Sequence, residues 1–156
     1  MAEYDPGWLA GKVVQGTPDA VIAADGDGKV ILWNSGAERI FGYTAAEAIG
    51  QSLDLIIPER LRKRHWDAYQ ASMASGTTKY GSDELLAVPA ERKDGTRISI
   101  EFTITLLRDD AGRLIGPAAV IRDVTARWNE QNELRKRLRD LEAKLPAAVE
   151  GSAAAT

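Results

Sequence analysis

The sequence contains no cysteine and a single histidine, and these two shortages exclude whole classes of chemistry. Without cysteine there is no disulfide, no thiolate metal site, no thiol nucleophile, no covalent c-type haem and no photocycle through a cysteinyl–flavin adduct. With one histidine, zinc motifs and metal triads that need two or more histidines are excluded too. Any chemistry in this chain therefore uses few reactive side chains.

Long apolar runs and a strong excess of one charge are also missing. No stretch approaches the ~18 apolar residues of a membrane span, and the acidic N-terminal segment lacks the apolar run of a signal peptide. The 20 Lys and Arg residues nearly balance the 23 Asp and Glu residues, for a net charge of −3. This balance gives no general attraction to nucleic acid or anionic lipid. We therefore expect a cytoplasmic protein that binds neither nucleic acid nor membrane.

Catalytic patterns are equally scarce. The acidic residues are scattered over turns, and no Asp or Glu pair has a spacing that suits a general acid and base. The sequence has no Walker-type phosphate loop and no Ser/His/Asp arrangement. We expect that the chain is not an enzyme. Its 156 residues, 44% of them hydrophobic, are enough for one domain with one core.

The first half of the chain predicts two strands followed by helices. Two apolar runs flank a glycine-rich turn at residues 25–28, which indicates a hairpin. Ser35 is predicted to cap a short helix that Gly42 ends. The next short helix opens with a capping box made by Thr44 and Glu47. A longer helix is then predicted from Pro58 to Gly76, its two ends marked by these residues.

Beyond Gly76 the hydrophobic period falls to two. Apolar and polar residues alternate over 97–106, which predicts a half-buried strand. Residues 84–91 are the predicted partner of that strand, and Pro89 within them favours an edge position or a bulge. A further strand is predicted over 114–122. Five antiparallel strands, split two and three around a helical insert, predict an α+β fold with helices on one face of the sheet.

The two ends of the chain carry unpaired apolar residues. The segment 1–16 holds a short apolar set that predicts a helical flank. Residues 125–145 predict a charged helix in which four leucines follow a 4-3-4 spacing, typical of a two-heptad seam: Leu134, Leu138, Leu141 and Leu145. This seam suits either a homodimer or a helix folded onto its own domain. Residues 146–156, rich in alanine, are expected to be a disordered tail.

At this point the sequence resembles the PAS family over roughly residues 14–126. The resemblance rests on TPDAVIAADGDGKVILWNSGAERIFGYTAAEAIGQSL, RKDGTRISIEFTI and IRDVT, with Asn34, the run 41–43 and the pair Asp123 and Thr125. It implies the PAS fold, a sensor domain over 17–124 with N- and C-terminal helical flanks, and sensing rather than catalysis.

A narrower resemblance lies in IIPERLRKRHWDAY, which is similar to the haem-binding PAS domains of FixL-type oxygen sensors and of direct oxygen sensor phosphodiesterases. In those domains the histidine of this helix is the proximal haem ligand, which corresponds to His65. On a helix, His65 shares one face with Leu61, Ala68 and Tyr69, and Trp66 is expected to flank that face. A neutral imidazole on a core-facing stripe suits iron binding. It equally suits a core histidine hydrogen-bonded to a backbone carbonyl.

The same resemblance implies a haem pocket against the sheet. Counted back from Gly95, the oxygen-contacting arginine of the haem sensors corresponds to Leu86, so a hydrogen-bond donor is missing and weak preference for O₂ is expected. The other implied pocket residues are apolar or small: Tyr69, Ile100, Phe102, Ile104 and Ala119. An ordinary filled core explains the same residues.

Two functions therefore stay open. The first is a gas or redox sensor with non-covalent haem b, held by His65, whose signal passes through the C-terminal helix to a signalling partner in trans. The second is a PAS interaction or dimerisation module without haem, either free of cofactor or binding an apolar metabolite. In both readings we expect a homodimer that uses residues 1–16, the helix over 126–145, or both.

Overall fold

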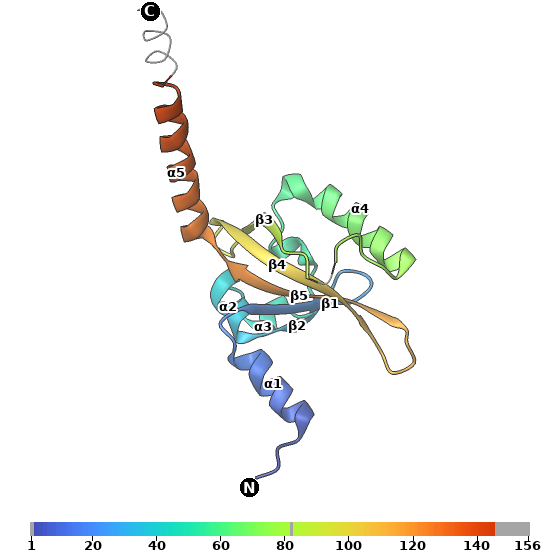
Figure 1. The fold of residues 1–156 in the computed structure, drawn as a ribbon. Helices are drawn as coiled ribbons and strands as arrows, with labels where there is room; N and C mark the ends of the chain where they lie inside the picture. The colour runs from blue at the N-terminus through green and yellow to red at the C-terminus, as the bar shows by residue number, and fades with distance from the viewer. Residues whose placement is uncertain (1, 82, 146–156) are drawn as a thin grey trace, which may run out of the picture. The chain divides into compact units, whose positions relative to one another are not determined.

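The computed structural model describes residues 2–81 and 83–145 (Figure 1). The chain divides between Asp123 and Val124 into two compact units, the first holding the sheet and the second the last helix. The elements follow one another as α1 (Pro6–Gly16), β1 (Ala20–Ala24), β2 (Val30–Trp33), α2 (Ser35–Phe41), α3 (Ala45–Ala48), η1 (Leu53–Leu55), α4 (Glu59–Ser75), β3 (Leu86–Glu91), β4 (Arg97–Arg108), β5 (Leu114–Asp123) and α5 (Thr125–Glu142).

The first unit is built on one five-stranded sheet in the order β2-β1-β5-β4-β3, and every neighbouring pair of strands is antiparallel. The predicted α+β fold with a five-stranded antiparallel sheet is therefore confirmed. The strand β3, which contains Pro89, lies at the edge. An edge position leaves one side of the strand without a neighbour, so a residue that lacks an N–H donor is tolerated there.

The helix-facing side of the sheet forms the core. On β4 the residues Ile98 and Ile100 are buried and alternate with Arg97 and Ser99, which are more exposed. The two-residue period therefore works as expected, with every second side chain directed to the core. The helices α2 and α3 pack on β1 and β2. The buried cluster consists of Ala20, Ile22, Val30, Trp33, Ala37, Phe41, Ala48, Ile56, Ala90, Ile98, Ile100 and Ile121.

The start of α2 differs from the prediction, because the N-cap residue is Asn34 and Ser35 is the first helical residue. The Asn34 side chain accepts hydrogen bonds from the backbone N–H groups of Ala37 and Val21 and donates to the carbonyl oxygens of Val14 and Asp19. Its side chain is completely buried. The Asn34 amide accepts through its oxygen and donates through its nitrogen at the same time, whereas the hydroxyl of a serine is shorter and has a single donor. These tertiary hydrogen bonds explain why the helix begins after Asn34 and not after Ser35.

The remaining helix ends follow the predictions closely. Thr44 and Glu47 form the expected capping box at the start of α3. Pro58 is the N-cap of α4, and Gly76 ends that helix in the left-handed conformation at φ +69°. Left-handed backbone is strained for residues with a Cβ atom, which explains the glycine.

The terminal segments are helical within the described residues. The helix α1 covers Pro6–Gly16, inside the predicted flank of 1–16. The helix α5 ends at Glu142, three residues before the predicted boundary at Leu145. The predicted disordered tail at 146–156 lies outside the described residues. No helix in the described ranges is both long enough and apolar enough to cross a membrane.

Candidate functional site

The candidate site begins with His65, which lies in the middle of α4 and is partly buried. Its ring packs with two aromatic rings, at centroid distances of 4.7 Å to Trp66 and 5.7 Å to Tyr69, which are themselves 5.1 Å apart. The Nδ1 atom of His65 is buried and has no hydrogen-bond partner among the described residues. A buried polar atom without a partner is uncommon in folded proteins, because desolvation costs about 1–3 kcal/mol. An ordered water or a bound ligand would supply the partner that this atom lacks in the described part of the chain.

Burial keeps the imidazole neutral. Removal of His65 from solvent lowers its pKa below the ordinary value of 6.5, and the nearby carboxylate of Asp54 opposes this shift only in part. Burial penalises the charged form of a histidine, so the neutral ring with a free lone pair is favoured near pH 7. A neutral imidazole is the form that binds a metal.

Tyr69, one turn along the same helix, is buried at 8% exposure. Its hydroxyl donates a hydrogen bond to the backbone carbonyl oxygen of Asp25 in the β1–β2 turn. Burial and the negative charges of Asp25 and Asp27 raise the pKa of the Tyr69 hydroxyl well above its ordinary value of 10.0. Tyr69 therefore stays a neutral hydrogen-bond donor and ties α4 to the sheet.

Trp66 corrects one expectation from the sequence, because it faces the domain instead of flanking the inward face. Its Nε1 atom donates to the Oδ1 atom of Asp54 at 2.8 Å. Its ring lies so close to Gly28 that a Cβ atom there would approach Trp66 to 2.2 Å. Ala68, expected on the inward face, is exposed. The inward face of α4 is therefore rotated from the predicted face toward Trp66. The large indole ring fits there because Gly28 has no Cβ atom.

Asp54 is the residue of this region that the sequence reasoning missed. The Asp54 carboxylate accepts the hydrogen bond from Trp66, and the backbone carbonyl of Asp54 accepts one from Arg62 at 3.3 Å. Arg62 also donates to the backbone carbonyl of Ile57 at 3.1 Å. These contacts link α4 to η1 and to the segment before the helix. No local pattern signals them, because Asp54 and Trp66 are 12 residues apart and belong to different elements.

The predicted pocket residues on the strands share the helix-facing side of the sheet. In the register of the sheet, Leu86 lies opposite Phe102, and Ile104 lies opposite Ala119. Ile100 is on the same side, because strand residues two apart point the same way. Ile100 is buried, whereas the other four are only partly buried. The structure thus places these five residues on one apolar surface.

That surface is less covered toward one end. Val88 lies opposite Ile100 on the same side of the sheet and is 39% exposed. By contrast, Ile22 on β1 and Ile121 on β5 are 4% exposed. The part of the apolar surface formed by β3 and the middle of β4 is therefore incompletely filled by side chains of the chain itself.

Two open hollows in the described part of the chain lie away from these residues. One, of about 470 Å³, is lined by residues of α2 and the β3–β4 turn, among them Arg39 and Lys93. The other, of about 510 Å³, is lined by polar residues of α5. Neither includes a predicted site residue. Within the described ranges no group of three or more His, Cys, Asp or Glu side chains could hold a metal ion.

The chain thus combines a five-stranded antiparallel sheet, on which α2 and α3 pack, with a partly buried imidazole on the long helix α4. The profile of the PAS fold matches residues 12–124, and the chain belongs to the PAS family. It is a PAS signalling module, which confirms the family inferred from the sequence motifs.

The individual relatives fall in the same class. The chain is 30% identical over 128 residues to the sensor protein FixL of Bradyrhizobium diazoefficiens, covering 82% of this chain and 24% of FixL. It is 27% identical over 118 residues to the oxygen sensor protein DosP of Escherichia coli, covering 75% of this chain and 14% of DosP. The chain thus spans less than a quarter of either relative. A PAS domain from Colwellia psychrerythraea has the same fold, with a TM-score of 0.67, 21% identity and coverage of 78% and 99%.

Proposed function

We propose that this PAS domain is a haem-based gas or redox sensor in which His65 is the proximal ligand of a non-covalent haem b. The lining of the site is the apolar surface already described, with Tyr69 on α4 and Leu86, Ile100, Phe102, Ile104 and Ala119 on the sheet. When bound, haem would supply an iron that binds a diatomic gas or changes oxidation state. The likeness to an oxygen sensor protein supports this class of signal.

The observation that carries the proposal is the partly buried imidazole of His65 on α4, whose Nε2 atom would bind the iron. A histidine that served only the core would be expected to donate or accept a hydrogen bond from the backbone, and Nδ1 has none in the described structure. The lowered pKa keeps the ring neutral. A neutral ring can bind a metal through one nitrogen, and the other nitrogen, here Nδ1, would then need a hydrogen-bond partner such as an ordered water.

The sheet surface fits a porphyrin in chemistry. A porphyrin presents a broad apolar plane. The residues proposed to line the site on the helix-facing side of the sheet are aliphatic or aromatic, and the small Ala119 lies opposite Ile104. All of them except Ile100 are only partly buried, and a ligand that covered their exposed apolar area would gain about 25 cal/mol for each Å². Leu86 offers no hydrogen-bond donor, so we expect weak preference for O₂ over CO.

The proposed relay runs along β5. Asp123, the last residue of that strand, accepts a hydrogen bond at 2.8 Å from Arg92, which lies in the turn after β3. A change at β3 and β4 can therefore reach the end of β5 through one ion pair. The proposed output is a homodimer that acts on a signalling partner in trans through the C-terminal helix.

The second candidate function is an interaction or dimerisation module that holds no haem, or that binds an apolar metabolite on the same surface. The partly buried apolar residues of β3 and β4 favour it as much as haem does. The two candidate functions differ in whether His65 binds a haem iron.

An absorption titration with hemin tests the proposal. The purified chain should give a Soret band that saturates at one haem per chain, and His65→Ala should lose it. Gln70→Ala, an exposed position on the same helix, is the matched control and should bind as the wild type does. Failure of the wild type to take up hemin would contradict the proposal, and His65→Ala would then alter only the unfolding free energy.

A second variant tests the position of Leu86. In the haem-loaded protein, Leu86→Arg should raise the affinity for O₂ relative to CO by about tenfold or more, since a hydrogen bond from a charged donor contributes roughly 1.5–3 kcal/mol. Ala87→Arg, one residue along and exposed, is the control. An equal change for both gases would show that Leu86 does not face the bound gas.

A further inference from the structure

The hollow between α2 and the β3–β4 turn is lined by more cationic than anionic side chains. Its volume is about 470 Å³, and its three cations are Arg39, Arg92 and Lys93. Within the described residues the lining holds one carboxylate, that of Asp94, and Ile40 adds an apolar residue from α2. The volume lies in the range of protein sites that hold a ligand or a few side chains of a partner. We call this site the basic hollow.

The cations of the basic hollow have hydrogen-bond donors left over. Arg39 is exposed and makes one long hydrogen bond, 3.4 Å from Nη2 to a backbone carbonyl. Arg92 donates through Nη2 to Asp123. Lys93 donates to Glu47. Because a guanidinium has five N–H donors and an ammonium has three, most of these donors lack a protein acceptor in the described part of the chain.

Acceptors are scarce in the same lining. The Asp94 carboxylate accepts a hydrogen bond from the backbone N–H of Thr96 at 2.8 Å. A site with many cationic donors and few acceptors favours an anionic ligand, because such ligands make charge-assisted hydrogen bonds. The Asp94 charge repels a compact double charge such as phosphate more than single carboxylates spread along a chain. The basic hollow therefore suits the carboxylates of an acidic peptide.

One of the cations connects the basic hollow to the proposed relay. Arg92 and Asp123 form an ion pair at 2.8 Å, and their side chains are 36% and 25% exposed. Asp123 is the last residue of β5, and α5 begins two residues later at Thr125. A carboxylate that approaches Arg92 from the hollow competes with Asp123 for the same guanidinium. Occupation of the basic hollow therefore weakens a contact at the end of β5.

We propose that the basic hollow binds an acidic segment of the signalling partner, in which carboxylates flank an apolar side chain. The carboxylates pair with Arg39 and Arg92, and the apolar side chain lies against Ile40. The inference rests on the partner in trans put forward in the proposed function and adds its chemistry and its contact surface. It does not depend on haem.

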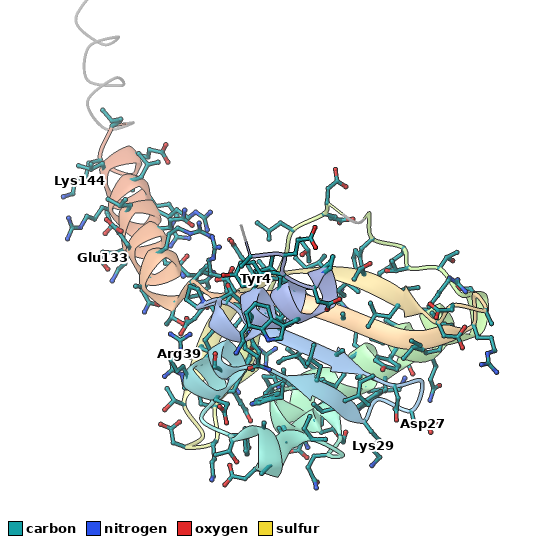
Figure 2. All side chains as sticks on the ribbon, turned by 90° about the horizontal axis from the view of Figure 1, so that it is seen from below. Tyr4, Asp27, Lys29, Arg39, Glu133 and Lys144 are labelled. Atoms are coloured by element: carbon teal, nitrogen blue, oxygen red, sulfur yellow. The ribbon has the colours of Figure 1, made fainter. Side chains whose placement is uncertain are left out.

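A labelled peptide tests the surface. The probe is a fluorescein-labelled peptide of four Glu-Leu-Glu repeats, and fluorescence anisotropy at low salt gives its Kd. Arg39→Glu/Lys93→Glu should raise the Kd at least about tenfold, since like charges then face each other across the contact. Lys29→Glu/Lys79→Glu makes the same change in charge at two exposed lysines outside the hollow and should stay within about twofold of the wild type. Figure 2 shows Arg39 and Lys29 well apart on the domain.

Changed probes separate the parts of the contact. A peptide with serine in place of every leucine should bind about three- to tenfold more weakly, because it loses the apolar contact. A peptide with lysine in place of every glutamate should not bind. If inorganic phosphate displaces the acidic peptide at equal concentration, the hollow is a simple anion site and the assignment to a peptide is wrong.

Asp123→Asn tests the competition for Arg92. Loss of this carboxylate frees the guanidinium, so the acidic peptide should bind about two- to fivefold more tightly, the range expected for one partly exposed ion pair. Asp109→Asn removes the same charge beside Arg113 in the β4–β5 turn and should leave the Kd unchanged. An equal change in both variants would contradict competition at Arg92.

The outcomes separate this inference from the haem proposal. A wild-type chain that does not bind the acidic peptide at millimolar concentration would overturn the basic hollow as a docking surface, as would a charge variant that binds as well as the wild type. Hemin uptake is measured separately on the same chain. Uptake of hemin without peptide binding leaves the haem proposal standing, and the reverse result leaves the docking surface standing.

Discussion

The helix-facing side of the sheet differs sharply between the part beside α2 and α3 and the part formed by β3 and the middle of β4. Beside α2 the side chains are buried and their polar groups paired, as with Phe41 at 0% exposure and Asn34 with four hydrogen bonds. Over β3 and the middle of β4, Phe102 and Leu86 are partly buried. The His65 Nδ1 atom on α4 has no hydrogen-bond partner within the described part of the chain. One part is a filled core, whereas the other is packed less completely.

The two phenylalanines of the chain give the largest expected contrast. Phe41→Ala removes a fully buried ring from the core, and we expect a loss of about 3–5 kcal/mol in unfolding free energy. Phe102→Ala removes a partly buried ring, so a loss of about 1–2 kcal/mol is expected. Urea denaturation measures both. Equal losses would show that the sheet surface over β4 is packed as tightly as the rest of the core.

Asn34→Asp tests the polar pairing beside α2. The carboxylate keeps the acceptor for Val21 and Ala37 but cannot donate to the carbonyl oxygens of Val14 and Asp19. Each buried group left unpaired costs about 1–3 kcal/mol, so we expect a loss of about 2–6 kcal/mol in unfolding free energy from the two carbonyls. Thermal and urea unfolding measure it. Asn129→Asp on α5 is the control and should stay within about 0.5 kcal/mol of the wild type.

Trp66→Phe tests how α4 is held. Phenylalanine keeps an aromatic ring beside Gly28 but loses the hydrogen bond from Nε1 to Asp54. We expect a loss of about 1 kcal/mol, because the bond has a charged acceptor but lies in a partly solvated place. Trp128→Phe, at a tryptophan that is 47% exposed, should change less than half as much. A reversed order would indicate that α4 is not anchored through Asp54.

Acid pH is expected to give the smallest effect. Folding lowers the pKa of His65 below its ordinary value of 6.5, because burial penalises the charged ring. As the pH falls, His65 therefore takes up a proton in the unfolded chain at a higher pH than in the folded chain. The unfolding free energy of the wild type should therefore fall as the pH decreases from 6.5 toward the folded pKa. One group contributes at most about 1.4 kcal/mol per pH unit in that window.

His65→Gln should lack this component, and its stability should depend less on pH between neutral and mildly acidic conditions. The carboxylates titrate in both proteins, so the difference between the two slopes isolates His65. If the two slopes coincide, the imidazole is not desolvated in the folded protein.

Part of this molecule follows from local sequence alone. The alternation over β4, the capping box of Thr44 and Glu47 and the end of α4 at Gly76 all depend on residues within a few positions of one another. Such interactions are present in a short segment, which is why period and capping residues predict them. The leucine spacing on α5 follows in the same way.

The tertiary structure decided the rest, because the contacts join residues far apart in the chain. The Tyr69 hydroxyl donates a hydrogen bond to the backbone carbonyl of Asp25, 44 residues earlier in the chain. Together with the hydrogen bond from Trp66 to Asp54, this contact sets which side of α4 faces the sheet. Asn34 replaces Ser35 as the cap because Val14 and Asp19 supply acceptors for its amide. Whether the Nδ1 atom of His65 finds a partner depends on which backbone groups the folded chain brings near it, and no spacing within one helix contains that information.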